Sequence, residues 1–369
     1  MNLECNTCAA EYEDRWRCEC GGTLVFSERA LPDSTPPDPT AFDGRNGLWS
    51  FRDFLPVGTT EGDRISLGEG MTPLVQAPTW AAQFKLEYVS PTGSFKDRGA
   101  TTTITRAREQ NVGHVIEDSS GNAGLAIATY AARAGIPATI FVPDQASAVK
   151  RSLIRRTGAT VVPVRGSRAA VTEACLAALD ASAGWYASHV WNPAFLAGTK
   201  TTAFEIALQY DWNVPDAVVA PVGHGTLLLG LAAGFEELIR AGWIDRRPRL
   251  LAVQASGMSP LVDALSDETT AGRPRNELAD GVQIRSPPRL EEMMDVMETF
   301  GGSAVAIDEP TLAHHHEALL HGGFTVEPTA ALGPAACQAF RDDGVIDDTD
   351  EIVVVLTGAN GAIGVDESI

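Results

Sequence analysis

The feature that most constrains the fold is a regular alternation of short β-rich runs with alanine-rich helical stretches from about residue 48 onward. Strands are predicted over residues 138–143 and 217–221, with helices over 124–134 and 227–240. The same pattern predicts a helix over 150–156 and strands over 159–164, 250–254 and 351–356. Such alternation is typical of a mostly parallel sheet covered by helices, which binds its ligand at the carboxyl ends of its strands.

Charge and hydropathy exclude several classes of function. The 369 residues carry 28 basic and 48 acidic side chains, a formal net charge of -20, which argues against nucleic-acid partners and anionic membrane surfaces. No run approaches the ~18 apolar residues of a membrane span, and the N-terminus lacks an apolar signal core, so we expect a soluble cytoplasmic protein. Only four of the cations are lysines, Lys85, Lys96, Lys150 and Lys200. This lysine-poor acidic composition fits either a halophilic source or an ordinary acidic protein from an arginine-rich genome.

Four of the six cysteines stand close together near the N-terminus, in the pattern C-x2-C-x9-C-x-C followed by two glycines. They are Cys5, Cys8, Cys18 and Cys20. Two close pairs separated by a short loop suit a tetrahedral structural zinc site, and free or oxidised thiols are the alternative. We therefore predict a zinc-ribbon-like module over residues 1–28 and a proline-rich linker over 29–47, with the module standing apart from the main body.

Three loops rich in small residues are candidates for chemistry. Lys96 lies in the segment 90–99 just before a helical stretch, where the helix dipole disfavours a cation and favours a nucleophilic amine, although a plain surface lysine is the commoner case. The segment 118–124 connects a strand to a helix and forms an anion cradle suited to a carboxylate, or else a tight turn in which Asn122 caps the helix. The segment 223–226 is a candidate phosphate cradle by the same physics.

Together these loops are far more specific than any one of them. PTGSFKDRG followed by SSGN resembles the β-family of pyridoxal-phosphate enzymes (fold type II, tryptophan synthase β-like), and specifically threonine synthases of an acidic archaeal type. The resemblance continues through the motifs GEGMTPL (68–74), GTKTTAFE (198–205), PVGHGT (221–226), ADG (279–281), GFTVEPT (323–329) and LTG (356–358).

The resemblance implies a role for each matching position. Lys96 would form a Schiff base with pyridoxal 5'-phosphate and shuttle protons, and Asn122 would bind the ring hydroxyl. The phosphate would lie on the backbone of Gly223, His224, Gly225, Thr226 and Leu227. Thr357 would face the pyridine nitrogen, and a neutral hydroxyl there favours elimination and replacement over transamination. Ser119, Ser120 and Gly121, together with Phe95, would bind the amino-acid substrate.

Three departures bear on the substrate. Phe195 stands where threonine synthases carry an Arg that binds the substrate phosphate, and an apolar ring cannot make that contact. His224 replaces an Asn. The ending at residues 357–362 is nearer to that of serine/threonine dehydratases. The implied reaction is therefore conversion of O-phospho-L-homoserine and water to L-threonine and phosphate. The alternatives are a serine/threonine dehydratase, a cysteine or cysteate synthase-like enzyme, or a non-catalytic ligand-binding homologue.

The resemblance also implies the domain organisation. Residues 48–96 and 196–369 would form a large cofactor-binding domain, and residues 97–195 a smaller inserted α/β subdomain. A homodimer is expected from the family. A histidine-rich stretch containing His314, Glu317 and His321 is interpreted as a solvated helix surface rather than a metal site, because nothing nearby completes a ligand set.

Overall fold

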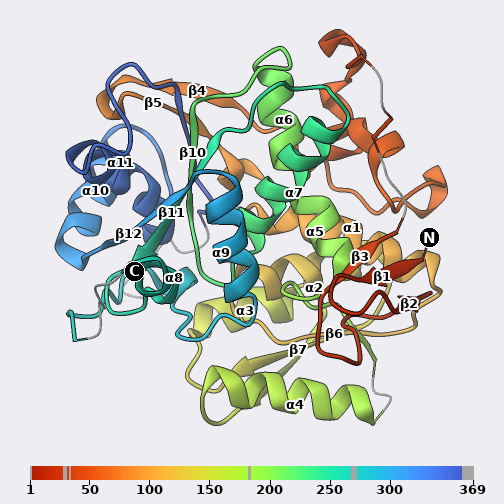
Figure 1. Ribbon diagram of the computed structural model, residues 1–369. Helices are drawn as coiled ribbons and strands as arrows, with labels where there is room; N and C mark the ends of the chain where they lie inside the picture. The colour runs from red at the N-terminus through yellow and green to blue at the C-terminus, as the bar shows by residue number, and fades with distance from the viewer. Residues whose placement is uncertain (1, 28–30, 33–34, 182–183, 267–271, 360–369) are drawn as a thin grey trace. The chain divides into compact units, whose positions relative to one another are not determined.

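The computed structural model describes residues 2–27, 31–32, 35–181, 184–266 and 272–359 (Figure 1). The chain divides into two compact units. The first comprises Met1–Pro32, Phe42–Gly70 and Lys96–Thr201, and the second comprises Asp33–Ala41, Met71–Phe95 and Thr202–Ile369. Each unit has its own open, mainly parallel sheet with helices packed against it, which confirms the predicted α/β class.

The first unit contains a four-stranded parallel sheet in the order β8-β7-β6-β9. Its strands are β6 (Val115–Glu117), β7 (Ala138–Pro143), β8 (Thr160–Val164) and β9 (Trp185–Tyr186). Its helices are α1 (Lys96–Glu109), α2 (Asn122–Ala134), α3 (Ala148–Arg156), α4 (Arg168–Asp180) and α5 (Pro193–Thr199). The alanine-rich face of α2 packs on β7, and the helix ends at Gly135, whose φ of 71° is the left-handed conformation that glycine adopts without strain.

The second unit contains a six-stranded sheet in the order β12-β11-β10-β13-β5-β4, parallel except for β4 against β5. Its strands are β4 (Leu74–Ala77), β5 (Ala82–Lys85), β10 (Ala217–Pro221), β11 (Arg249–Ala255), β12 (Ser303–Ile307) and β13 (Ile352–Val355). Its helices are α6 (Thr201–Gln209), α7 (Thr226–Arg240), α8 (Pro260–Leu265), α9 (Leu290–Thr299), α10 (Glu309–His321) and α11 (Leu332–Asp342). Strands β10 and β13 are wholly buried, as expected for central strands covered on both faces.

Short 3-10 helices complete the secondary structure of the described residues. They are Pro39–Ala41, Gly44–Phe54, Glu61–Asp63, Pro78–Trp80, Glu87–Val89, Asp280–Val282 and Pro328–Ala331. No helix among the described residues is long and apolar enough to cross a membrane.

The N-terminal cysteine module is a three-stranded antiparallel sheet that packs on the rest of the first unit. Its strands are β1 (Leu3–Cys5), β2 (Glu11–Tyr12) and β3 (Leu24–Phe26), in the order β2-β1-β3. Trp16 lies edge-on to Tyr186 at 5.1 Å between ring centroids, and the Arg17 guanidinium lies 3.9 Å from the ring centroid of Trp191. The prediction that the module stands apart is therefore wrong, because its loop carries aromatic and cationic side chains that pack on aromatic rings near β9.

Residues 42–70 also belong to the first unit, whereas the resemblance places residues 48–96 in the larger domain. A buried carboxylate explains this grouping. Glu69 accepts hydrogen bonds from the Trp49 indole (3.1 Å) and from the Tyr130 hydroxyl of α2 (2.7 Å). Since a buried carboxylate is costly without such partners, these bonds fix the segment against α2.

Candidate active site

Lys96 is the first residue of α1 and is partly buried. Its Nζ lies 5.9 Å from the ring centroid of Phe195 in the same unit. The preceding residue, Phe95, is buried and donates its backbone N–H to the carbonyl of Thr357 at 3.0 Å. The amine therefore stands at the positive end of a helix dipole, a condition that favours its neutral, nucleophilic form, and lies over the ring of Phe195.

The loop Ser119–Gly121 follows β6 and leads into α2, which begins at Asn122. The N-cap is Gly121, and no side-chain bond caps the helix among the described residues, so the alternative in which Asn122 is the cap is wrong. A Cβ at Gly124 would lie 1.8 Å from the carbonyl oxygen of Ser119, so only glycine allows the loop to fold back so closely on the first turn of α2. The start of α2, with its positive end of the helix dipole, is a kind of site that suits an anion such as a carboxylate.

The loop Gly223–Thr226 connects β10 to α7 in the second unit. Gly225 has φ 84°, and a Cβ there would come within 2.3 Å of Met293 Sδ, so the tight turn requires glycine. Gly225 is also the N-cap residue of α7, and no side-chain hydrogen bond caps this helix among the described residues. His224 is partly exposed, while Thr226 and Leu227 are buried. A glycine-rich turn at the N-terminus of a helix such as α7 is a kind of site that suits a phosphate.

Thr357 follows β13, the neighbour of β10 in the parallel sheet. Since parallel strands end at the same edge, Thr357 and the Gly223 loop lie at the carboxyl edge of one sheet. Thr357 is 5% exposed, and its hydroxyl oxygen has no hydrogen-bond partner among the described residues. The buried hydroxyl of Ser94 is likewise without a partner within the described structure. Unpartnered buried hydroxyls are costly, and at a sheet edge of this kind a bound group can complete them.

Further motif segments converge in the second unit. A Cβ at Gly223 would lie 3.1 Å from Val282 Cα, and Gly281 donates its backbone N–H to the hydroxyl of Thr329 at 3.1 Å. Glu327 donates its backbone N–H to the carbonyl of Gly358 at 2.9 Å. The structure thus brings together the ADG, VEPT and LTG motifs, which lie far apart in the sequence.

These features fit pyridoxal 5'-phosphate. The glycine loop before α7 suits a phosphate, and the unpartnered hydroxyl of Thr357 suits a neutral ring nitrogen. Lys96 supplies an amine at a helix start. When bound, this cofactor supplies an electron sink for bonds at the substrate carbons.

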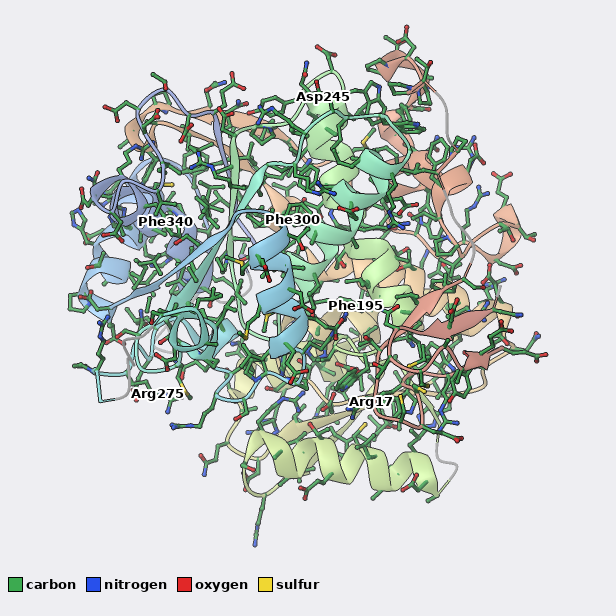
Figure 2. The ribbon with its side chains drawn as sticks, in the orientation of Figure 1. Arg17, Phe195, Asp245, Arg275, Phe300 and Phe340 are labelled. Atoms are coloured by element: carbon green, nitrogen blue, oxygen red, sulfur yellow. The ribbon has the colours of Figure 1, made fainter. Side chains whose placement is uncertain are left out.

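Phe195 occupies the position where threonine synthases carry an Arg. Its ring is fully buried on α5 (Figure 2). A Cβ at Gly99 of α1 would lie 2.3 Å from this ring, so Phe195 fills the space that the missing side chain of Gly99 leaves. The structure thus gives this residue a packing role. Of the ending at residues 357–362, residues from Asn360 onward lie outside the described residues.

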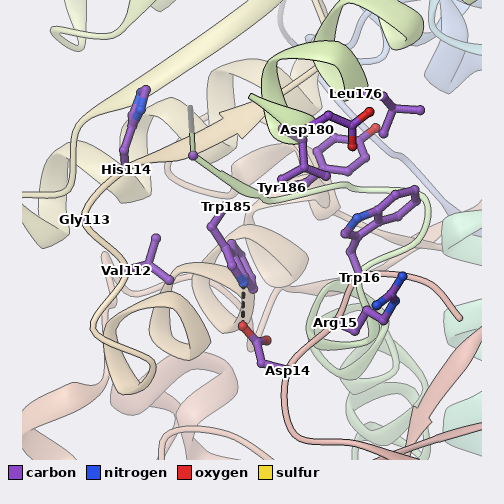
Figure 3. A pocket seen from close by; sticks show the side chains of 12 residues that line it. Asp14, Arg15, Trp16, Val112, Gly113, His114, Leu176, Asp180, Trp185 and Tyr186 are labelled. Atoms are coloured by element: carbon purple, nitrogen blue, oxygen red, sulfur yellow. Dashed lines mark hydrogen bonds between the residues drawn. The ribbon is translucent and has the colours of Figure 1, made fainter. Parts of the chain in front are cut away.

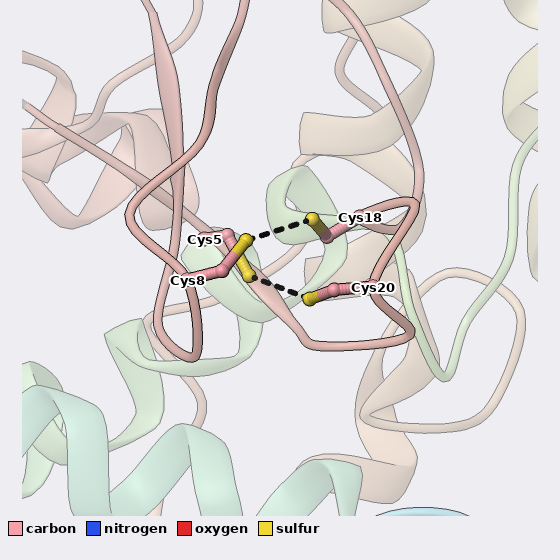
Figure 4. Close-up of side chains that lie close together, drawn as sticks. All are labelled: Cys5, Cys8, Cys18 and Cys20. Carbon is pink, nitrogen blue, oxygen red and sulfur yellow. Dashed lines mark hydrogen bonds between the residues drawn. The ribbon is translucent and has the colours of Figure 1, made fainter.

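The four N-terminal cysteines meet in one cluster (Figure 4). Their Sγ atoms all lie within 4.8 Å of one another, with Cys5 and Cys20 at 3.6 Å and Cys8 and Cys18 at 3.5 Å. A tetrahedral zinc with bonds of ~2.3 Å separates its sulfurs by about 3.8 Å, so the cluster fits this ion. The Tyr12 hydroxyl lies 3.2 Å from Cys18 Sγ and lowers the pKa of this thiol to about 6. Cys18 therefore favours its thiolate, the form that binds metal, whereas the pKa values of Cys8 and Cys20 are raised above their usual range.

A cavity of about 920 Å³ lies beside the cysteine module in the first unit (Figure 3). Asp14 and Trp16 of the module and Trp185 and Tyr186 of β9 line it, and the Trp185 indole donates to Asp14 at 2.9 Å. None of the predicted site residues lines this cavity.

The histidine-rich stretch lies on α10, as expected. His316 donates through Nε2 to the carbonyl of Val326 at 2.8 Å. Within the described part of the chain, two groups of side chains are close enough to share a metal, and neither includes a histidine of α10. One is the cysteine cluster, and the other is Glu117, Asp118 and His189.

Sequence reasoning missed two buried charged pairs. In the second unit, Lys85 Nζ bonds Glu205 Oε2 at 2.8 Å, the carbonyl of Thr72 at 2.7 Å and Gln209 Oε1 at 3.0 Å. Glu205 in turn accepts the backbone N–H of Met71 at 2.7 Å, which fixes the GEGMTPL motif. In the first unit, Glu117 lies 2.5 Å from His189. The only available signal was a charged residue inside each buried strand.

Comparisons with known proteins agree with this geometry. The family model "Pyridoxal-phosphate dependent enzyme" matches residues 65–358. Threonine synthase of Methanocaldococcus jannaschii is 31% identical, over 97% of this chain and 92% of that protein. Threonine synthase of Mycobacterium tuberculosis is also 31% identical, over 88% and 91%.

Among solved structures, threonine deaminase isoform 2 of Solanum lycopersicum has a TM-score of 0.68 at 21% identity, covering 91% of this chain and 89% of that one. Maize serine racemase has a TM-score of 0.68 at 21% identity, covering 78% and 88%. These likenesses show the shared fold. The predicted resemblance is confirmed: the chain belongs to the family of pyridoxal-phosphate-dependent enzymes and is a threonine synthase-like member of it.

Proposed function

We propose that the protein is a threonine synthase, which converts O-phospho-L-homoserine and water to L-threonine and phosphate. The observation that carries the proposal is the buried, unpartnered hydroxyl of Thr357 at the same sheet edge as the Gly223 loop. A neutral hydroxyl beside the ring nitrogen moderates the electron sink and favours elimination and addition at the β and γ carbons. Similarity to threonine synthases over 97% of the chain supports the same reaction.

Each predicted residue has a role in this proposal. Lys96 holds the cofactor covalently and moves protons through its Nζ atom. The backbone of Gly223–Leu227 binds the cofactor phosphate, with His224 at the rim, and Asn122 orients the cofactor through its hydroxyl. Ser119–Gly121 bind the substrate carboxylate, and Phe95 also takes part in substrate binding. The carboxylate loop and the phosphate cradle both rest on helix N-termini, which stabilise negative charge.

The reaction is tested by incubating purified holoenzyme with O-phospho-L-homoserine and measuring released phosphate and L-threonine. We expect both products in equal amounts. Lys96→Ala should abolish product formation and also the visible absorption band of the covalently bound cofactor, while Lys150→Ala is a matched lysine control that should retain both. Absence of both products in wild type that displays the band rejects the proposal.

A second candidate follows from Phe195. Because this buried ring supplies no cation for a substrate phosphate, a serine/threonine dehydratase remains the competing function. Keto-acid formation from L-threonine or L-serine, with no threonine formed from O-phospho-L-homoserine, would favour it. Phe195→Tyr keeps the aromatic ring and should leave the preferred substrate unchanged, because Phe195 packs on Gly99 and does not select the substrate.

We also propose that Cys5, Cys8, Cys18 and Cys20 bind one structural zinc. The support is the separation of their sulfur atoms and the hydrogen bond from Tyr12 to Cys18. Elemental analysis should find one zinc per chain, and Cys18→Ser should lose it. Wild type with no zinc after purification without chelators, and with four reactive thiols, would show free cysteines instead.

We further propose that the protein is cytoplasmic, forms a homodimer and comes from a halophilic source. A cytoplasmic location suits the six cysteines, none of which forms a disulfide. A homodimer is tested by sedimentation of the holoenzyme. The halophilic source predicts a melting temperature that rises between low and molar KCl, because salt screens the net charge of -20. An unchanged melting temperature would favour the arginine-rich genome.

A further inference from the structure

Two acidic residues stand directly before the loop Ser119–Gly121. The second of them, Asp118, has a full set of partners. Its Oδ1 accepts from the Tyr186 hydroxyl at 2.8 Å, and its Oδ2 accepts from Thr172 of α4 at 2.6 Å and lies 2.9 Å from the Arg168 guanidinium. The charge of Asp118 is thus compensated on the side of α4.

The first, Glu117, is fully buried and its surroundings are different. Its Oε1 lies 2.5 Å from Nδ1 of His189, while its Oε2 has no hydrogen-bond partner among the described residues. A buried carboxylate with one bare oxygen pays a large desolvation cost if it is charged without a counter-ion. The pair therefore needs a proton, either on the carboxyl or on the imidazole.

The groups that face this pair favour the same conclusion. Burial raises the pKa of the Glu117 carboxyl well above its usual range, and Asp118 adds to the effect, whereas Arg168 and Lys96 oppose it. Glu117 also acts on the neighbouring Tyr186 and Cys175, whose pKa values are raised chiefly by their own burial. His189 lies 6.3 Å from the Phe195 ring, which also faces Lys96. The pair thus shares its surroundings with the reactive amine.

A metal ion does not explain the cluster of Glu117, Asp118 and His189. Two ligands bound to one ion at ~2.1 Å stand about 3 Å or more apart. The distance of 2.5 Å between Glu117 and His189 is instead that of a short charge-assisted hydrogen bond. Asp118 is already engaged by three other residues.

We propose that Glu117 and His189 hold one proton between them at neutral pH, which keeps net negative charge away from the base of the loop Ser119–Gly121. The two are positioning residues that set the affinity of this loop for the carboxylate of an amino-acid substrate. The inference rests on the proposed role of the loop. Loss of the shared proton at alkaline pH places one negative charge near the bound carboxylate, which weakens binding on the order of tenfold at a separation of ~10 Å.

The test is the Kd of the holoenzyme for L-threonine, read from the change in the cofactor's visible absorption between pH 7 and pH 9.5. We compare wild type, Glu117→Gln and Thr172→Val, a near-isosteric control that removes a hydroxyl bonded to Asp118 and to the carbonyl of Arg168. Ionisation of the ligand amine and of the cofactor is common to all three proteins. We expect wild type and Thr172→Val to lose about tenfold more affinity over this range than Glu117→Gln. The same pH dependence in all three would overturn the proposal.

A second measurement uses wild type alone, in case Glu117→Gln does not fold. Nitrogen NMR of 15N-histidine-labelled holoenzyme should show one histidine whose ring nitrogens titrate over the pH range in which the affinity falls. If no histidine titrates there, the proposal is wrong. Neither measurement needs turnover. A failure to make threonine from O-phospho-L-homoserine would therefore count against the proposed function, while the affinity and NMR measurements would still test the role of Glu117 and His189.

Discussion

The two buried charged pairs, one in each unit, differ in how completely they are satisfied. In the second unit, Lys85 has three acceptors around its ammonium group, and its partner Glu205 also accepts backbone N–H groups of the GEGMTPL motif. In the first unit, Glu117 has one short bond to His189 and one bare oxygen. A completely bonded pair fixes a backbone segment, whereas an incompletely bonded pair can exchange a proton in response to pH.

Breaking the satisfied pair should have the largest effect on stability. Lys85→Met leaves Glu205 buried with an uncompensated charge, so we expect a loss of about 3–5 kcal/mol in the free energy of unfolding. Urea denaturation measures this loss. The double variant Lys85→Met/Glu205→Gln, which removes both charges, should recover part of it. A loss below ~1 kcal/mol in the single variant would contradict the assigned role.

Removing one partner from Asp118 should cost less. Tyr186→Phe deletes a single hydroxyl that donates to the carboxylate, and Thr172 and Arg168 still compensate its charge. We expect a loss of about 1–2 kcal/mol in the free energy of unfolding. Tyr12→Phe, which also deletes one hydroxyl in the first unit but far from Asp118 in sequence, serves as a comparison in zinc-loaded protein. Equal stability of Tyr186→Phe and wild type would mean that water replaces the lost bond.

The pair Glu117 and His189 should make the free energy of unfolding depend on pH. The pKa of Glu117 is higher in the folded than in the unfolded chain, so the folded state keeps a proton that the unfolded state releases. The contribution of Glu117 to the free energy of unfolding is therefore complete below the usual glutamate pKa. It declines as the pH rises toward the pKa of Glu117 in the folded protein. Glu117→Gln should show a shallower decline than wild type in urea titrations between pH 5 and pH 8. Parallel curves would indicate that Glu117 carries the same charge in both states.

Thr357 extends the comparison to a neutral group and should give the smallest effect on stability. Because its hydroxyl has no partner among the described residues, Thr357→Val should change the unfolding free energy of the apoenzyme by less than ~1 kcal/mol. The holoenzyme should respond more strongly, with a shifted cofactor absorption band and weaker cofactor binding. Thr103→Val, at another buried hydroxyl without a partner in the described structure, should leave the band unchanged.

Local motifs made much of this structure predictable. The strands β7 and β10 have the predicted bounds, because each is a continuous apolar run limited by turn residues. The Lys96, Ser119 and Gly223 segments each combine small residues with a helix start within about ten positions, so their loop character could be recognised without knowledge of the fold.

The charged pairs could not be predicted in this way. Lys85 and Glu205 are 120 positions apart, and Glu117 and His189 are 72 apart, so only the completed sheet brings the partners together. The attachment of the cysteine module has the same cause. Trp16 contacts Tyr186, which lies far away in the sequence, and the residues near either one do not indicate this contact.

The packing of the module on the region around β9 has a consequence for protein engineering. Deleting residues 1–28 would remove the contacts that Asp14, Trp16 and Arg17 make with three aromatic side chains, those of Trp185, Tyr186 and Trp191. An exposed apolar patch promotes self-association. A shortened chain would therefore precipitate even if its catalytic machinery were intact, and truncation is a poor way to isolate the catalytic body of this enzyme.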